Sequence, residues 1–167
     1  MKVPALYFRA GAGAVIMNRG GLVLALERLD VPGSWQLPQG GLKESESPLQ
    51  AMFREVREET GIRRKDLELL DAYPEPLAYE LPARAWSKKT GRGQVGYWFL
   101  VRYGRADESI NLKGSPEFKS WEWISFDQLI ARVVEFRKSV YRSLNERFKP
   151  HLAKAGRKPS RRVPLKV

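Results

Sequence analysis

The stretch that constrains the fold most spans residues 40–62 and reads GGLKESESPLQAMFREVREETGI. It contains signals for both ends of one helix. Ser47 can cap the free amides of a first turn, Pro48 suits the first helical position, and Gln50 can complete a capping box. Gly61 can adopt the left-handed conformation that ends a helix. The sequence therefore predicts one helix between Ser47 and Gly61.

That helix has two different sides. Its apolar side should pack on a core and, at helical spacing, carries Leu49, Met52, Phe53 and Val56. Its acidic side, centred roughly 120° away, carries Glu55, Glu58 and Glu59. Like charges within one turn repel one another, and in an arbitrary helix such a stripe is a solvated face. Because the chain as a whole is strongly basic and a hard cation such as Mg²⁺ would relieve the repulsion, we predict a metal site here.

The spacing within residues 40–62 resembles the signature of the Nudix hydrolases, G-x5-E-x7-R-E-U-x-E-E-x-G-U, in which U is a bulky aliphatic residue. Every fixed position of that signature is filled, by Gly40, Glu46, Arg54, Glu55, Val56, Glu58, Glu59, Gly61 and Ile62. The resemblance implies an α+β fold, in which a mixed β-sheet lies between helices as an α/β/α sandwich with a central motif helix. It also implies an enzyme that hydrolyses a pyrophosphate bond in a nucleoside diphosphate linked to another moiety.

The same resemblance implies roles for the motif residues. Glu55, Glu58 and Glu59 would bind Mg²⁺ or Mn²⁺, with more than one ion in the site, and one of them could act as the base. Arg54 would orient or pair with a carboxylate, and the backbone at Gly40 would approach the metal. Bound divalent ions lower the pKa of water and stabilise charge on the transferring phosphoryl group. The identity of the base and the number of ions stay open.

Segments outside the motif resemble a narrower branch of this family, which holds bacterial RNA pyrophosphohydrolases and dinucleoside polyphosphate hydrolases. They fall between residues 9 and 148 in the same order as in that branch. They read SWQLPQGG from Ser34, YELP from Tyr79, SPEFKSWEW from Ser115 and VVEFRKSVYR from Val133. The loop at residues 31–33, Ala10-Gly11 and the segment 84–94 depart from the pattern, which leaves the substrate open and the reaction intact.

The closer resemblance implies further site residues. Glu117 would supply a fourth metal ligand or the base, and Tyr79 and Phe136 would flank a nucleobase, since stacking on aromatic rings tolerates different bases. Three basic side chains would lie near the substrate phosphates, namely Arg9, Arg28 and Arg137. Each of these residues also has a simpler interpretation, because charged residues are commonly at the surface and aromatic residues of a helix are commonly in the core.

Three functions agree with these features. The first is removal of pyrophosphate, or of phosphate stepwise, from 5′-triphosphorylated RNA. The net charge of +11 favours it, because RNA adds backbone phosphates beyond the reacting end. The second is asymmetric cleavage of diadenosine tetraphosphate and related dinucleoside polyphosphates. The third is a catalytically silent module that binds RNA or nucleotides, and the complete acidic set argues against it. No feature predicts DNA sequence recognition, and the oligomeric state stays open.

The composition excludes several classes of site. With no cysteine in the chain, thiolate nucleophiles, cysteine-rich zinc sites and disulfides are excluded. The single histidine, His151, is expected at the surface rather than as a general base. No apolar run approaches the ~18 residues of a membrane span, and the N-terminus lacks the apolar core of a signal peptide. Together these features predict a cytoplasmic protein that does not enter a membrane.

The rest of the chain predicts one domain over residues 1–152 and a basic tail over residues 153–167 that is disordered on its own. The tail contains no acid and holds Lys154, Arg157, Lys158, Arg161, Arg162 and Lys166. An irregular stretch is expected around Tyr79 and a mobile basic loop at 84–94, whereas strands are predicted at 13–18, 22–27, 67–72, 95–103 and 117–124. A capping box at Ser125 predicts a long helix to about residue 148, with a buried side of Leu129, Val133, Val140 and Leu144.

Overall fold

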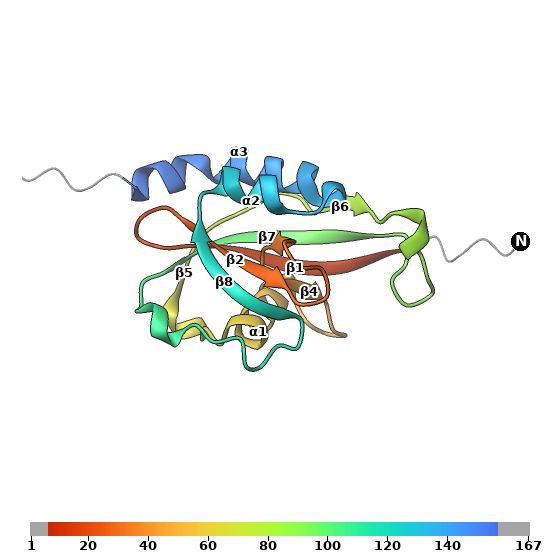
Figure 1. Ribbon diagram of the computed structural model, residues 1–167, viewed down its shortest axis with the longest axis horizontal. Coiled ribbons are helices and arrows are strands. Elements are labelled where there is room, and N and C mark those ends of the chain that lie inside the picture. Colours follow the sequence, from red (N-terminus) through yellow and green to blue (C-terminus); the bar gives the residue numbers. More distant parts are fainter. Residues whose placement is uncertain (1–6, 157–167) are drawn as a thin grey trace, which may run out of the picture.

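The computed structural model describes residues 7–156, in which eight strands form one sheet (Figure 1). The strands are β1 (Phe8–Met17), β2 (Val23–Arg28), β3 (Trp35–Gln36), β4 (Gln39–Gly41), β5 (Leu67–Ala72), β6 (Leu77–Glu80), β7 (Gly93–Tyr103) and β8 (Phe118–Ile124). The α-helices are α1 (Pro48–Thr60), α2 (Phe126–Arg132) and α3 (Lys138–Ala155). Short 3₁₀ turns occur at Arg64–Asp66, Ala83–Ala85, Asp107–Ser109 and Glu135–Arg137.

The centre of the sheet is the parallel pair of β1 and β7. Their register runs from Phe8 beside Gly93 to Met17 beside Arg102. The other pairings are antiparallel: the strand order is β3-β2-β1-β7-β5, with β4 added to β1, β6 to β7 and β8 to β2. The sheet is therefore mixed, as expected. β1 and β7 run side by side in the same direction along its centre.

Helices cover both faces of the sheet. Figure 1 shows α1 on one face and α2 with α3 on the other. Each face has its own apolar core, because side chains alternate across a strand. On the α1 side the core includes Ile16, Leu24, Met52 and Val56. On the α3 side it includes Val15, Trp98, Tyr141 and Phe148. This confirms the predicted α/β/α sandwich with a central motif helix.

The motif helix α1 begins and ends at the predicted residues. The Ser47 Oγ accepts a hydrogen bond from the Gln50 backbone amide (3.2 Å), and the Gln50 side chain accepts one from the Ser47 amide (2.9 Å), which completes the capping box. Gly61 has a φ of 72° and donates its N–H to the Arg57 carbonyl. Both caps are local features, which is why the sequence alone predicts them.

The C-terminal region differs from the single long helix that the sequence predicts. α2 ends at Arg132, and Val133 and Val134 have extended backbone angles, with ψ values of 153° and 145°. A 3₁₀ turn follows before α3 begins at Lys138. Two successive β-branched residues favour extended backbone over helix. The predicted buried side is correct nevertheless, since the core contains Leu129, Val133, Val140 and Leu144.

Three other predictions about local structure need correction. Tyr79 lies in a strand rather than an irregular stretch, because β6 pairs with β7 and places Tyr79 opposite Gln94. β7 begins at Gly93 rather than at residue 95, and the segment before it contains a 3₁₀ turn and a bridge between Ser87 and Gly91. α3 continues to Ala155, past the predicted helix end at about residue 148.

The predicted tail from residue 157 onward lies outside the described residues. Within residues 7–156, no helix is both long and apolar enough to cross a membrane.

Candidate active site

Most of the predicted site residues meet in one pocket of about 500 Å³. It lies where β4 and the first residues of β1 and β7 approach α1. Among the predicted residues, its lining includes Arg9, Arg28, Gly40, Arg54, Glu55, Glu58, Glu59, Glu117 and Arg137. Tyr79 lines a small adjoining hollow that shares Gly40 and Gln94 with this pocket, and Phe136 stacks on Tyr79. The fold thus gathers residues that lie far apart in the sequence around one acidic helix.

Gly40 brings the backbone of β4 directly against the acidic side of α1. It pairs with Ala12 of β1, which fixes the position of β4. A Cβ atom built on Gly40 would overlap the carboxylate of Glu55. A glycine is therefore required for this close approach, and the Glu55 side chain lies against the peptide backbone at the floor of the pocket.

Glu59 is the most enclosed of the helix carboxylates, with only 5% of its surface exposed. Its Oε2 accepts one hydrogen bond, from the Gln39 backbone amide at 3.1 Å. Burial, and then the nearby charges of Glu55 and Glu117, raise the pKa of the Glu59 carboxyl well above its ordinary value. A buried carboxylate beside other acids is costly unless a cation compensates it.

Arg54 holds the motif loop on the helix. Its Nε and Nη2 donate to the two carboxylate oxygens of Glu46 at 2.7 and 2.8 Å, and Nη2 also donates to the Gly41 carbonyl at 2.8 Å. This pairing lowers the pKa of Glu46 to about 2. The remaining Nη1 donates to Glu55 at 2.5 Å and to Glu58 at 3.4 Å. Arg54 therefore connects the loop to two of the predicted metal ligands.

Glu55 lies between Arg54 and the pocket. Burial raises the pKa of its carboxyl, although the Arg54 guanidinium opposes this effect. Glu58 is more open, with 52% of its side chain exposed. Glu117 approaches from the loop that leads into β8, and its carbonyl accepts a hydrogen bond from the Leu29 amide at 2.8 Å. Three acids on α1 and one on a loop thus face the same space from two sides.

The donor set suits a hard divalent cation. The oxygens available to the pocket are those of four carboxylates and the backbone at Gly40 and Gly41, and oxygen donors are what Mg²⁺ and Mn²⁺ prefer. Within the described part of the chain, no three acidic or histidine side chains already converge closely enough to hold a metal ion. In this structure the Glu55 carboxylate accepts a hydrogen bond from Arg54 Nη1.

The opposite wall of the pocket is built around Gln36, which was not among the predicted site residues. Gln36 is 2% exposed, and its Oε1 accepts hydrogen bonds from Arg137 Nη1 and, at 3.3 Å, from Arg28 Nη1. Arg28 also forms two hydrogen bonds to Asp30, at 2.8 and 2.7 Å. Arg137, in contrast, is 8% exposed and its guanidinium is held by neutral acceptors, Gln36 and the hydroxyl of Tyr79. Arg137 therefore offers an anion in the pocket a positive charge to which none of the described carboxylates is hydrogen-bonded.

Gln39 and Gln94 are further lining residues that sequence reasoning did not select. Gln39 lies inside the SWQLPQGG segment, so the resemblance there was an available signal. Gln94 accepts a hydrogen bond from the Tyr79 hydroxyl at 2.7 Å. Its position depends on the pairing of β6 with β7, which no local pattern reveals.

The two predicted base-binding aromatics lie together, but not on either side of a gap. The rings of Tyr79 and Phe136 stack directly, with centroids 5.7 Å apart and an angle of 30° between their planes. Tyr79 is 7% exposed, whereas Phe136 is half-buried. The two rings leave no space for a base between them in this structure, and the predicted role of the pair in base binding stays a prediction. Phe136 is the ring of the pair that keeps an exposed part, and the Arg137 guanidinium carbon lies 5.8 Å from its centroid.

Comparisons with known proteins agree with this geometry. A family model described as NUDIX domain matches residues 7–144. The RNA pyrophosphohydrolase of Cereibacter sphaeroides (strain KD131) is 40% identical over 154 residues, which cover 89% of this chain and 94% of that protein. Nudix hydrolase 26, chloroplastic, of Arabidopsis thaliana is 38% identical, over 91% of this chain and 74% of that protein.

Among solved structures, a binary complex of a C. elegans Ap4A hydrolase is similar in fold, with a TM-score of 0.66 and 22% identity, over 85% of this chain and 98% of that chain. The fold, the filled signature around α1 and these relatives lead to one conclusion: the chain belongs to the Nudix hydrolase family.

Proposed function

We propose that this protein is a divalent-metal-dependent pyrophosphohydrolase that acts on the 5′-triphosphate end of RNA. The observation that carries the proposal is the pocket in which the carboxylates Glu55, Glu58, Glu59 and Glu117 face the guanidinium groups of Arg9 and Arg137. Such a pocket has carboxylate oxygens that can bind cations on one wall and guanidinium N–H groups that can bind phosphates on the other. Pyrophosphate hydrolysis needs both, because several phosphate charges must be neutralised while water attacks.

The acidic wall is where we assign metal binding. Glu55, Glu58, Glu59 and Glu117, with the backbone at Gly40, would hold Mg²⁺ or Mn²⁺, and we propose more than one ion. When bound, such ions lower the pKa of water and neutralise developing phosphate charge. Arg54 keeps Glu55 and Glu58 in place through Nη1 while it anchors Glu46. The rigid capped helix then presents the carboxylates at fixed spacing.

The basic wall is where we assign substrate binding. Arg137 has no carboxylate bonded to it among the described residues, so a phosphate oxygen would satisfy its free N–H groups. Arg9 lies at the rim, against Gly41. Arg28 is already neutralised by Asp30, which limits it to a supporting role beside Gln36. A nucleobase next to these phosphates would stack on the open side of Phe136.

RNA is the preferred substrate for two reasons. Several relatives that are named RNA pyrophosphohydrolase match most of this chain, including those of Cereibacter sphaeroides at 40% and Proteus mirabilis at 42% identity. The chain also carries a net charge of +11, which favours a polyanion. The same site could cleave diadenosine tetraphosphate, which is therefore the competing substrate. The cysteine-free composition fits our assignment of the reaction to the reducing cytoplasm.

A direct comparison of the two substrates tests this proposal. Purified protein with Mg²⁺ should be offered 5′-triphosphorylated RNA and diadenosine tetraphosphate, and kcat/KM measured for each. We expect a higher kcat/KM for the RNA. A higher value for the dinucleotide would reverse the substrate assignment and keep the reaction class. Hydrolysis of neither substrate, by protein that is folded and supplied with metal, would contradict both.

A further inference from the structure

A second hollow, of about 780 Å³, lies on the outer side of α1 and joins the active-site pocket. The two share Arg54 and Glu58 in their linings, so one opens beside the other. Besides Glu58, this hollow contains only basic side chains among its charged residues, namely Arg54, Arg57, Arg63, Arg64 and Lys65. Five cations against one acid make it an anion-attracting surface that begins at the predicted metal ligands.

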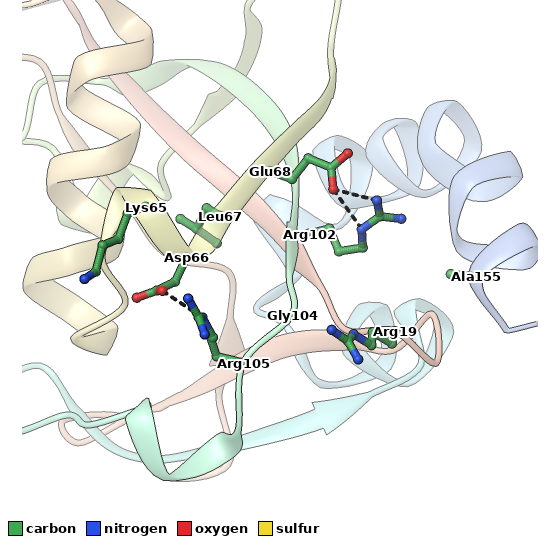
Figure 2. A pocket seen from close by; sticks show the side chains of 9 residues that line it. All are labelled: Arg19, Lys65, Asp66, Leu67, Glu68, Arg102, Gly104, Arg105 and Ala155. Carbon is green, nitrogen blue, oxygen red and sulfur yellow. Dashed lines mark hydrogen bonds and ion pairs between the residues drawn. The ribbon is translucent and has the colours of Figure 1, made fainter.

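The basic surface continues beyond this hollow. Lys65 also lines a third hollow of about 650 Å³, whose basic residues include Arg19, Arg102 and Arg105 (Figure 2). Arg102 is neutralised there, because it donates twice to Glu68, at 3.2 and 2.5 Å. Arg19 comes from the turn between β1 and β2, at the end of the sheet opposite to Arg9. The three hollows therefore form a series that leads from the carboxylates toward the far edge of the sheet.

Asp66 fixes two arginines on either side of the boundary between the second and third hollows. Its side chain is only 7% exposed. It accepts Arg105 Nε at 3.0 Å and Arg63 Nε at 3.4 Å, and Figure 2 shows the pairing with Arg105. Both bonds use Nε, and none of the described residues accepts a hydrogen bond from the Nη atoms of either arginine. Each guanidinium is thus oriented while its two outer amino groups face solvent.

Arg64 is held in a different way. Its guanidinium carbon lies 4.8 Å from the centroid of the Phe53 ring, which is a cation–π contact. Stacking occupies the face of a guanidinium and leaves the N–H groups at its edge available for phosphate. Lys65 follows directly in the chain and lines both hollows. Three successive basic residues therefore lie at the junction of the series, and two of the three are held in place by neighbouring side chains.

We propose that this surface binds the sugar–phosphate backbone of single-stranded RNA downstream of the reacting 5′ end. We call it the basic track and define it as Arg57, Arg63, Arg64, Lys65, Arg105 and Arg19. The inference rests on the proposed function, since it assumes that the 5′ end lies at the carboxylates. A strand held there must leave the pocket, and the track is a basic path that opens from it at Glu58. Regularly spaced phosphates suit a row of oriented guanidinium groups.

The test compares two variants that lose the same number of charges. In the first, Arg63, Arg64 and Lys65 are all changed to Gln. In the control, the exposed residues Arg142, Arg147 and Lys149 of α3 are changed to Gln, on the opposite face of the sheet (Figure 1). Melting curves establish that both variants fold. Because both have the same net charge, any difference between them reports the position of the charges and not the overall field.

Binding is measured first, without any reaction. A labelled RNA of about 20 nucleotides with a 5′-hydroxyl is titrated at several salt concentrations, since each neutralised phosphate of a single strand contributes a slope of about −0.7 in log K against log salt. The track variant should bind at least about tenfold more weakly than the control at low salt, with a slope that is shallower by about 2 for three lost contacts. Equal affinities for the two variants would overturn the proposal.

Hydrolysis then separates this proposal from the proposed function. The ratio of kcat/KM for long triphosphorylated RNA to that for diadenosine tetraphosphate should fall about tenfold in the track variant relative to the control, because the dinucleotide has no downstream backbone. A ratio that is the same in both variants would contradict the track while leaving RNA hydrolysis intact. If the wild type does not hydrolyse RNA but the binding difference is present, the proposed function fails and the track as an RNA-binding surface stands.

Discussion

Among single residues, Glu59 is the carboxylate of α1 whose burial distinguishes it from its neighbours. It lies on the same helix as Glu55 and Glu58, yet it alone of the three is buried, and its pKa is raised chiefly by that burial. Spacing on the helix predicts that these three carboxylates share a side, because position on a helix is a local property. It could not predict which of them is enclosed, since the pairing of β4 with β1, which brings the Gln39 amide to Glu59, decides that.

Replacement of Glu59 by Gln should stabilise the metal-free protein. In the unfolded chain this carboxyl loses its proton near 4.5, whereas in the folded protein it keeps the proton to a higher pH. At a pH between these two pKa values, the folded protein holds a proton that the unfolded chain has lost. The free energy of unfolding therefore falls as the pH rises through this range. In EDTA at neutral pH, the Glu59→Gln variant should melt higher, by about 2–4 °C for each kcal/mol regained, and should show a weaker pH dependence. Identical pH profiles for variant and wild type would contradict the raised pKa of the buried Glu59 carboxyl.

Phe136 provides a second test at this scale. It is half-buried on Tyr79, so truncation to Ala should cost roughly 1–2 kcal/mol, less than the 3–5 kcal/mol of a fully buried Phe. If a base stacks on its open side, KM for RNA should rise in Phe136→Ala and also in Phe136→Leu, which restores apolar contact without a ring. Melting curves and KM measure the two effects separately. An unchanged KM in both variants would exclude Phe136 from base binding.

At the scale of elements, the sequence predicts what is determined locally. The caps of α1 at Ser47 and Gly61 and the strand β5 are found at their predicted residues. The break between α2 and α3 was missed because apolar residues continue at helical spacing across Val133 and Val134, and their extended backbone is what ends α2. β6 was missed because its pairing with β7 joins segments separated by an irregular loop.

The contact between β4 and α1 leads to a prediction for Gly40→Ala. The added methyl group would overlap the Glu55 carboxylate, so either β4 or the Glu55 side chain must move. A displacement of about 1 Å can cost up to 10²-fold in rate, and we expect kcat to fall at least about tenfold in a folded protein. Gly20→Ala is the matched control, because the nearest atom to its new methyl group would be 3.4 Å away. Wild-type kcat in Gly40→Ala would show that this approach is not needed for catalysis.

At the scale of the whole molecule, the sheet brings the site together. The parallel pairing of β1 with β7 sets Arg9 beside Gln94, and the C-terminal segment that holds Arg137 folds back onto β6 and β3. These contacts join residues that lie 58 to 101 positions apart, so no periodicity indicates them, and only the family resemblance selected Arg9 and Arg137. Gln36 and Gln94 were not selected because a glutamine at a pocket wall has no distinctive sequence pattern.

The basic C-terminal tail is tested by truncation. α3 runs to Ala155, so the chain should end after Gly156, which removes Arg157, Lys158, Arg161, Arg162 and Lys166 and leaves the helix whole. We propose that the tail binds RNA, and that its removal therefore flattens the salt dependence of kcat/KM for long triphosphorylated RNA, by about 0.7 in slope for each lost phosphate contact. The melting temperature and kcat/KM for diadenosine tetraphosphate should change little. An equal effect on both substrates would contradict a role in RNA binding.

The central claim is that carboxylates of α1 bind divalent metal for hydrolysis, and activity with and without the Glu58 carboxylate tests it most directly. Glu58 is half-exposed and carries no part of the core, so Glu58→Gln should fold normally. With Mg²⁺ or Mn²⁺ and triphosphorylated RNA, kcat of the variant should be at least ~100-fold below that of the wild type, in line with loss of a major electrostatic stabiliser. EDTA should abolish the wild-type reaction, and added Mg²⁺ or Mn²⁺ should restore it. Near-normal turnover by a folded Glu58→Gln protein, or wild-type turnover that survives EDTA, would contradict the account.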